Sequence, residues 1–177
     1  MKKSYFQTGA FLLGLTVLFL FSCKKEEASS PQTGKKQQWI AGSWKQKDVV
    51  TAVTVKLAGT GIPAGSSLIT LAPMLAQALK NPALAEGILC TRSNVYTFGP
   101  DKTYSINGCT ELLLPGIGDK GSWQLTIYDA VLQFTSATGQ KVPHWINSIT
   151  GSELRLAATL SVPGVGDLPL SMILQKQ

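Results

Sequence analysis

The second half of the chain consists of short runs in which apolar and polar residues alternate, separated by turn residues about every ten positions. The run SELRLAATLSV at 152–162 places the apolar side chains from Leu154 to Val162 on one face. The run GSWQLTIYD at 121–129 alternates in the same way. A period of two predicts antiparallel strands with one buried face. About eight such strands at this spacing indicate a closed barrel or a sandwich, the two forms that protect exposed sheet edges.

The expected strands fall on both sides of a different kind of segment. One pair comes early in the chain, and a longer series follows residue 90. The strand over 139–151 is expected to be broken, because Pro143 cannot donate a ladder hydrogen bond. We expect strands at 43–51, 53–57, 93–98, 103–108, 110–115, 121–129, 130–136, 139–151, 152–162 and 167–176.

The stretch at about 59–89 predicts a helical insertion between the first two strands of the barrel. Its start, GTGIPAG, is a cluster of strand-breaking residues, after which Ser66 could cap a helix that ends before Asn81-Pro82. Residues 83–89 are expected to form a short further turn at most. The helix could cover the barrel mouth as a lid, or it could simply pack as core. Its apolar stripe consists of Leu68, Leu71, Leu75 and Leu79.

The first 22 residues have the parts of a secretory signal. Two lysines follow Met1, an apolar stretch runs to Phe21, and Ser22 precedes Cys23. The apolar run is shorter than the roughly 20 residues that a spanning helix needs. The sequence Leu20-Phe21-Ser22-Cys23 resembles a bacterial lipobox. This resemblance implies that residues 1–22 are removed and that Cys23 becomes the acylated (palmitate-bearing) N-terminus, although secretion without acylation is the alternative.

Residues 23–38, CKKEEASSPQTGKKQQ, predict a disordered tether, because they are rich in Lys, Glu, Ser, Gln and Pro. The folded domain is expected over 39–177, a length typical of one domain. The sequence Lys25-Glu26-Glu27 resembles the signal that directs some lipoproteins to the outer face of the outer membrane. The expected location is therefore the outer membrane, lipid-anchored, on its periplasmic or cell-surface side.

The formal net charge of +6 is no indication of nucleic-acid binding. Much of it lies in the signal and the tether. From residue 39 onward ten Lys or Arg stand against eight Asp or Glu, and they are scattered along the sequence. A nucleic-acid footprint needs a clustered basic face, so we expect no nucleic-acid partner.

Apart from Cys23, the chain has two cysteines, Cys90 and Cys109. In an exported protein an even pair predicts a disulfide. Free thiols and a metal site are the alternatives. A metal is disfavoured because His144, the one histidine, lies outside any metal-ligand spacing.

Gly42-Ser43-Trp44, at the start of the first strand, resembles the Gly-x-Trp signature of lipocalins. That resemblance implies an up-and-down barrel of about eight strands whose end is closed by Trp44 beneath a basic side chain from a late strand. Arg155 is the candidate for this basic residue.

The order of motifs resembles more closely the lipocalin-like domains of bacterial lipoproteins. CTRSNVYTFGPDKTYSINGCTE at 90–111, then GSWQL and ITGSELRL, follow that order. The resemblance supports pairing Cys90 with Cys109. If Phe98 pairs with Thr103, the two cysteines also lie nearly opposite each other across the hairpin.

Catalytic and cofactor chemistry has little basis in the sequence. His144 lies between Pro143 and Trp145, which favours packing, and no Gly-x-Ser-x-Gly elbow is present. The repeat PGIGD (115–119) and PGVGD (163–167) predicts two glycine turns at one end of the barrel rather than a calcium site. We therefore expect no enzyme activity, no metal and no cofactor.

The resemblance implies a membrane-anchored binding protein for a small hydrophobic or amphipathic ligand. The alternative is a surface accessory lipoprotein with a filled barrel, which binds a protein or glycan through its loops. The sequence assigns no ligand-binding residues.

Overall fold

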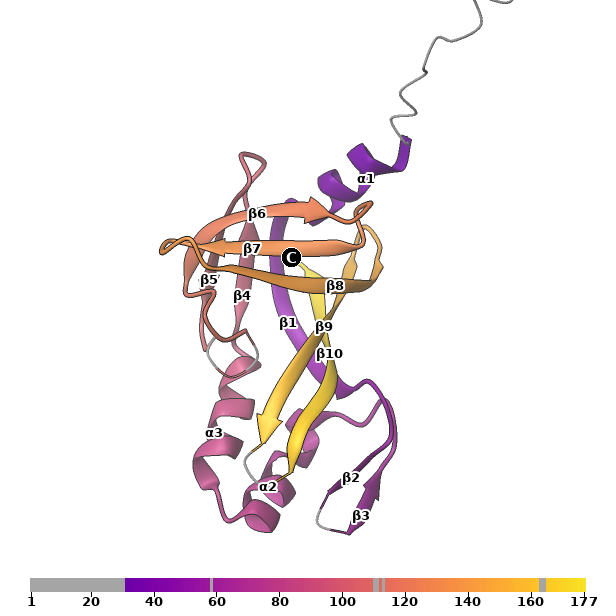
Figure 1. Cartoon of the computed structure of the whole chain (residues 1–177), viewed down its shortest axis with the longest axis vertical. Helices are drawn as coiled ribbons and strands as arrows, with labels where there is room; N and C mark the ends of the chain where they lie inside the picture. Colours follow the sequence, from indigo (N-terminus) through magenta and orange to yellow (C-terminus); the bar gives the residue numbers. More distant parts are fainter. Residues whose placement is uncertain (1–30, 58, 110–111, 113, 163–164) are drawn as a thin grey trace, which may run out of the picture. The chain divides into compact units, whose positions relative to one another are not determined.

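Eight antiparallel strands form a closed barrel in the computed structural model, which describes residues 31–177 except 58, 110–111, 113 and 163–164 (Figure 1). Each barrel strand pairs with the barrel strands that come before and after it in the sequence. The first strand, β1, closes the ring by pairing with both β4 and β10. The predicted up-and-down barrel is thus confirmed. Its strands are β1 (Gly42–Thr51), β4 (Val95–Phe98), β5 (Thr103–Asn107), β6 (Lys120–Thr126), β7 (Val131–Ser136), β8 (Lys141–Ile149), β9 (Glu153–Val162) and β10 (Gly166–Lys176).

Helix α1 (Pro31–Ile40) precedes the barrel and lies near the β6–β7 turn (Figure 1). It covers residues that the sequence analysis assigned to the tether. Two local features stabilise it. Lys35 stacks on Trp39 one turn later, with its Nζ 5.1 Å from the ring centroid, and Ile40 is fully buried. The predicted signal, Cys23 and the first part of the tether lie outside the described residues.

The insertion after β1 contains a small hairpin, β2 (Val55–Leu57) with β3 (Thr60–Ile62), followed by two helices, α2 (Leu68–Leu79) and α3 (Pro82–Thr91). Ser67, not Ser66, caps α2, because its Oγ accepts from the amide of Thr70. The expectation of only a short turn over 83–89 is wrong. Asn81 caps α3 and Pro82 stands in its first turn, so the two residues expected to end one helix also begin the next. Among the described helices, none has the length and apolar character needed to cross a membrane.

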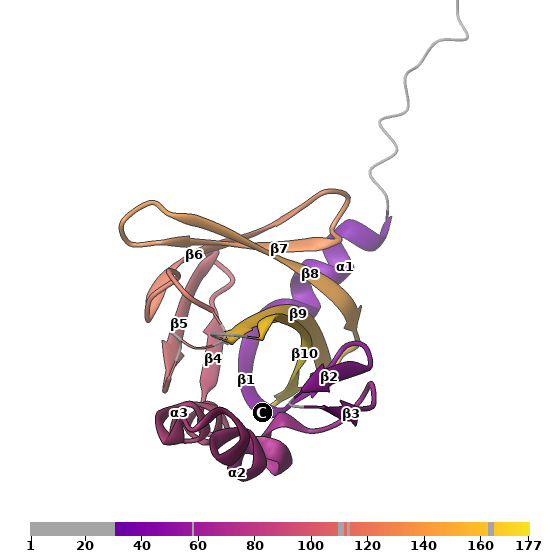
Figure 2. The ribbon, with the colours of Figure 1, turned by 60° about the horizontal axis from the view of Figure 1, so that its bottom comes forward.

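The two inserted helices belong to the core. Leu68, Ala72 and Leu75 on α2, and Ile88 on α3, are buried in the same cluster as the inward residues of the barrel. Figure 2 shows α2 and α3 side by side at the end of the barrel opposite α1. The predicted apolar stripe of α2 does face the core, although Ala72 is more buried than Leu71 or Leu79.

The described residues of the strand expected at 110–115, which are Leu112, Leu114 and Pro115, lie in turns or bends of the loop between β5 and β6. Leu114 and Ile117 are fully buried. Leu112 reaches α3, where a Cβ at Gly87 would lie 3.4 Å from the leucine methyl. The loop therefore fills space between the barrel and α3 instead of extending the sheet.

Candidate functional site

The barrel end near α1 is closed around Trp44. This side chain is fully buried, and its Nε1 donates to the carbonyl of Ile40 at 2.7 Å. Lys176, which pairs with Trp44 in the ladder, places its Nζ 5.1 Å from the Trp44 ring centroid and donates to the carbonyl of Trp39 at 2.9 Å. Gly42 leaves room for this lysine, because a Cβ there would lie 3.0 Å from Lys176 Cε.

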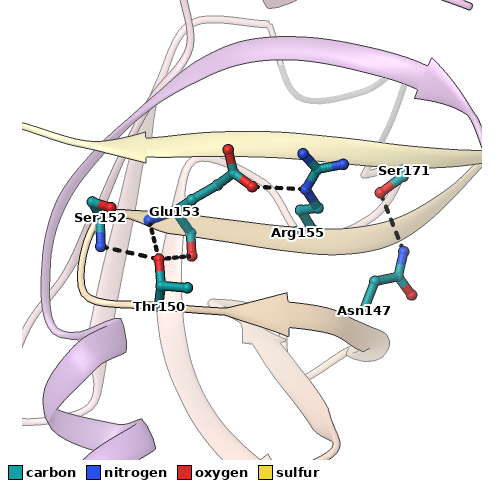
Figure 3. A network of polar contacts seen from close by, with 6 residues as sticks. All are labelled: Asn147, Thr150, Ser152, Glu153, Arg155 and Ser171. Atoms are coloured by element: carbon teal, nitrogen blue, oxygen red, sulfur yellow. Dashed lines mark hydrogen bonds and ion pairs between the residues drawn. The ribbon is translucent and has the colours of Figure 1, made fainter. Parts of the chain in front are cut away.

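The predicted partner of Trp44, Arg155, lies elsewhere. Its Nε donates to the Glu153 carboxylate at 2.7 Å on β9, where the arginine side chain is 40% exposed (Figure 3). The basic residue over Trp44 comes from β10 instead. The sequence analysis did not consider Lys176, because only the pairing of β1 with β10 brings this residue over Trp44.

Aromatic side chains fill the barrel interior next to Trp44. Phe98 packs edge-on against Trp123 at 5.8 Å between centroids, and Phe134 contacts both Phe98 and Tyr104. Trp123, from the second Gly-Ser-Trp, also has a lysine over its ring, with Lys102 Nζ at 4.2 Å from the centroid. These side chains leave this end occupied by packed rings.

Two buried tyrosines extend the packing. Burial raises the pKa of Tyr96 to about 12, and its hydroxyl donates to Gln46 Oε1 at 3.0 Å. Burial, with the negative charge of Asp119 adding to it, also raises the pKa of Tyr104. Tyr104 donates to the carbonyl of Ile117 and so holds the β5–β6 loop on the barrel. Both phenols therefore act as neutral structural donors at physiological pH.

Cys90 and Cys109 form the predicted disulfide, with their Cα atoms 5.9 Å apart. It does not cross the β4–β5 hairpin, as the sequence reasoning assumed. Cys90 lies in the last turn of α3, and Phe98 pairs with Tyr104 rather than Thr103. The bond ties α3 to the start of the β5–β6 loop. Its function is structural. The sequence analysis misplaced it because it did not expect helix α3, which carries Cys90.

Two strands around the ring from β1, the strands β8 and β9 separate. Their pairing covers Ile146 to Ile149 on β8, with an irregularity at Asn147, and stops there. Residues 141–145 still pair with β7, but the ladder with β9 does not continue. Figure 1 shows β8 crossing the barrel while β9 runs down toward the helices. We call this opening the seam.

Pro143 lies in the half of β8 that borders the seam. The predicted break in this strand does not occur, since β8 is continuous from Lys141 to Ile149. The proline is tolerated because β8 has no ladder partner on its β9 side at this position. Pro143 was therefore the one sequence signal for the seam.

A pocket of about 310 Å³ lies in the seam. Its lining is mostly apolar, with Trp145 at its edge more than half exposed, at 55%. Thr159 and Ser161 add hydroxyl groups. A concave, mostly apolar surface with a few polar groups is typical of a small-molecule site, and this volume is at the lower end of the roughly 300–1,000 Å³ range. The complete lining is Pro115, Val142, Pro143, His144, Trp145, Ala157, Ala158, Thr159 and Ser161.

His144 is the polar side chain at the centre of the seam. Its Nδ1 lies 3.0 Å from the carbonyl oxygen of Ala157, bridging the two separated strands, and its ring packs edge-on against Phe134 at 5.6 Å. A carbonyl can only accept, so Nδ1 carries the proton. Burial lowers the pKa of His144 despite this hydrogen bond, so the ring is neutral at pH 7.

The second ring nitrogen of His144 is left as an acceptor. Nε2 is buried and has no hydrogen-bond partner among the described residues. A buried acceptor without a donor costs about 1–3 kcal/mol. The sequence analysis interpreted His144 as a packing residue, and it does pack; it also lines the seam pocket and carries an unpartnered ring nitrogen.

The described residues of the two PG-x-GD repeats lie close to the seam. Gly116 and Gly118 have the positive φ angles expected of such turns, and Pro115 shares the pocket lining with Ser161. Ser161 donates to Asp167, which follows the second turn, at 2.6 Å. In the described part of the chain, no group of three or more His, Cys, Asp or Glu side chains is placed to hold a metal.

The barrel, the disulfide and the seam can be set beside known proteins. No protein-family model and no curated protein sequence matches the chain. Among solved structures it is similar to lobster apocrustacyanin A1, with 10% sequence identity and a TM-score of 0.31. The match covers 82% of this chain and 65% of the lobster chain. The barrel itself has eight antiparallel strands in up-and-down order, an architecture that lipocalins also have.

Proposed function

We propose that this protein is a lipocalin-like carrier that binds a small amphipathic molecule at the seam between β8 and β9. The observation that supports it is the pocket in which an exposed tryptophan, Trp145, and a buried free acceptor, His144 Nε2, line one mostly apolar wall. The packed rings fill the barrel interior behind this wall, where Phe134 contacts both Phe98 and His144. The ligand would therefore bind at the side of the barrel rather than at its centre.

The lining defines the chemistry of the ligand. Proline, alanine and valine side chains, with the face of Trp145, suit an apolar or aromatic body. His144 Nε2 suits a hydroxyl or N–H donor on that body, because a neutral imidazole with its proton on Nδ1 accepts at Nε2. Among the described lining residues, none carries a carboxylate or an amine. An uncharged amphiphile with one donor group fits this set best.

Fluorescence titration with the neutral probe N-phenyl-1-naphthylamine tests the site. We expect saturable binding by the full chain, weakened about tenfold or more in Trp145→Ala, a loss of about 1.4 kcal/mol. Tyr128→Ala is the matched control, since Tyr128 is fully exposed on the β6–β7 turn, outside the pocket lining. Equal losses in both variants, or none in either, would refute the seam as the site.

We further propose that the protein is attached to the outer membrane through acylated Cys23. The support is the sequence Leu20-Phe21-Ser22-Cys23 together with the polar stretch that follows it. Two or three acyl chains would hold it firmly, because each buried CH₂ contributes about 0.8 kcal/mol. Cys23→Ser should shift the protein from the membrane to the soluble fraction and remove the acyl mass from the mature N-terminal peptide. A variant that stays in the membrane fraction would refute the anchor without affecting the proposed ligand site.

A further inference from the structure

A second pocket, of about 240 Å³, lies where β1 meets β10 and the connection from α3 to β4. Three basic residues, Lys45, Lys47 and Arg92, surround it. They are separated by up to 47 positions in the sequence, where the charges looked scattered. The fold gathers them. Two glutamines, Gln46 and Gln175, complete the lining.

An irregularity in β1 places the two lysines at this pocket. The register with β10 shifts between Gln46 and Asp48, so Lys47 is an extra residue without a ladder partner. Such bulges redirect side chains and are common beside binding sites. On the other edge of β1, pairing with β4 ends at Lys45. Both lysines are exposed at this point.

Arg92 is held on both sides by covalent and hydrogen bonds. Two residues before it, Cys90 is linked to Cys109. Two residues after it, the buried Asn94 accepts from the Cys109 amide at 2.6 Å and donates to the Cys109 carbonyl at 2.8 Å. The carbonyl of Asn94 in turn accepts from the amide of Gln46 at 2.9 Å. The backbone that carries Arg92 is thus fixed directly against the bulged part of β1.

Among the described residues that line the pocket, none is acidic, so the three positive charges have no counter-charge there. Asp48, the nearest in sequence, accepts instead from Ser67 at 2.8 Å and from the Val49 amide at 2.7 Å. The ion pair found among the described residues is Arg155 with Glu153. Gln46 Nε2 is buried and has no acceptor in the described structure, while Gln46 Oε1 accepts from the buried Tyr96 hydroxyl.

We propose that this pocket, defined by Lys45, Lys47 and Arg92, binds a phosphate group. Arginine forms paired hydrogen bonds to two oxygens of an oxyanion, and lysines supply point charges from other directions. A tetrahedral phosphate has enough oxygens for several such donors. The pocket is smaller than the roughly 300–1,000 Å³ of sites that enclose a whole small molecule. It therefore suits a phosphate or the phosphate of a lipid headgroup, and it is separate from the seam.

NMR titration of the full-length ¹⁵N-labelled protein with sodium phosphate, at constant ionic strength set by sodium chloride, tests the proposal. We expect saturable shifts centred on the amides of residues 45–47 and 92–94. The double variant Lys47→Gln/Arg92→Gln should weaken phosphate binding at least tenfold. Lys141→Gln is the matched control, because Lys141 is exposed and lies outside the pocket lining.

Two results would overturn the proposal. Shifts that grow without saturation and involve lysines all over the surface would indicate diffuse attraction to charge. An equal loss of affinity in Lys141→Gln and in the double variant would show that the pocket is not the site. Correct folding of the double variant is checked by the unchanged amide spectrum of residues far from β1.

The source of the phosphate is separated by a second titrant. Dihexanoyl phosphatidylglycerol below its micellar concentration presents a headgroup phosphate, and dihexanoyl phosphatidylcholine presents the same phosphate beside a cation. Saturation by inorganic phosphate alone assigns a free phosphate or phosphorylated metabolite. Saturation by phosphatidylglycerol at lower concentration than phosphatidylcholine assigns an anionic headgroup. Both outcomes require loss in the Lys47→Gln/Arg92→Gln variant.

Discussion

The strand pairing around β1 and the strand pairing between β8 and β9 differ: the first closes the ring and the second is interrupted. Around Trp44 the ring is closed, with β1 paired to both β4 and β10, and the interior is filled by Trp44, Phe98, Trp123 and Phe134. Between β8 and β9 the ladder stops, and one histidine bridges the gap to a backbone carbonyl. Strand pairing and side-chain packing stabilise the region around Trp44. At the seam the ladder is interrupted, which leaves a pocket and the unpartnered acceptor His144 Nε2.

The largest difference is expected between two tryptophans. Trp44→Ala removes a fully buried ring and should lower the free energy of unfolding by about 3–5 kcal/mol. Trp145→Ala removes a half-exposed ring and should change it by no more than about 0.5 kcal/mol. Urea unfolding followed by circular dichroism measures both. A large loss in Trp145→Ala would show that the seam tryptophan is part of the core after all.

The disulfide should come next. Replacing Cys90 and Cys109 together by alanine opens a link across 19 residues and should cost about 3 kcal/mol in the chain-entropy description. The effect should appear as a lower urea midpoint. It should also loosen Arg92, so phosphate-induced shifts at residues 92–94 should weaken. Unchanged stability would mean that Asn94 and the loop packing alone hold α3.

The residue that covers Trp44 can be identified by a matched pair. Lys176→Met removes the cation above the ring and the hydrogen bond to Trp39, and should cost about 1 kcal/mol. Arg155→Met breaks an exposed ion pair and should cost no more than about 0.5 kcal/mol. The same urea assay compares them. The reverse order would restore Arg155 as the capping residue.

The smallest effect on stability is expected from His144, the one histidine of the chain. Burial lowers its pKa in the folded state, so the unfolded chain binds the proton more readily. Stability should therefore fall as the pH drops below about 6.5, the ordinary histidine value, and through the lowered folded pKa. Unfolding curves at pH 5.5, 6.5 and 7.5 should show this slope, and His144→Gln should remove it.

Protonation of His144 should change the affinity for a ligand more than it changes the stability of the fold. Protonation turns His144 Nε2 from an acceptor into a donor, so an uncharged ligand that donates there loses its partner. The affinity for N-phenyl-1-naphthylamine, whose amine can donate, should fall with pH in the wild type and remain flat in His144→Gln. A pH-independent affinity in the wild type would place the probe away from His144.

The sequence predicted the parts of the fold that depend on local pattern. Alternation located β9 and β7 closely, and the turn residues at 99–102 located the β4–β5 hairpin. The sequence-based prediction failed where the same residues are compatible with two different local structures. Asn81-Pro82 ends one helix and starts another, and Leu112, in the apolar run expected as a strand, contacts α3 from a turn instead. Local pattern does not show which surface an apolar run will meet.

The sequence by itself determined a series of short antiparallel strands, a helical insertion and a pair of cysteines able to bond. Their causes are local: a period of two, a period near 3.6 and the chemistry of thiols. Tertiary structure alone decided that Lys176 rather than Arg155 covers Trp44, and that Lys45, Lys47 and Arg92 meet. It also decided that β8 leaves β9 at Ile146. These depend on register and closure between strands distant in the chain, which no single segment encodes.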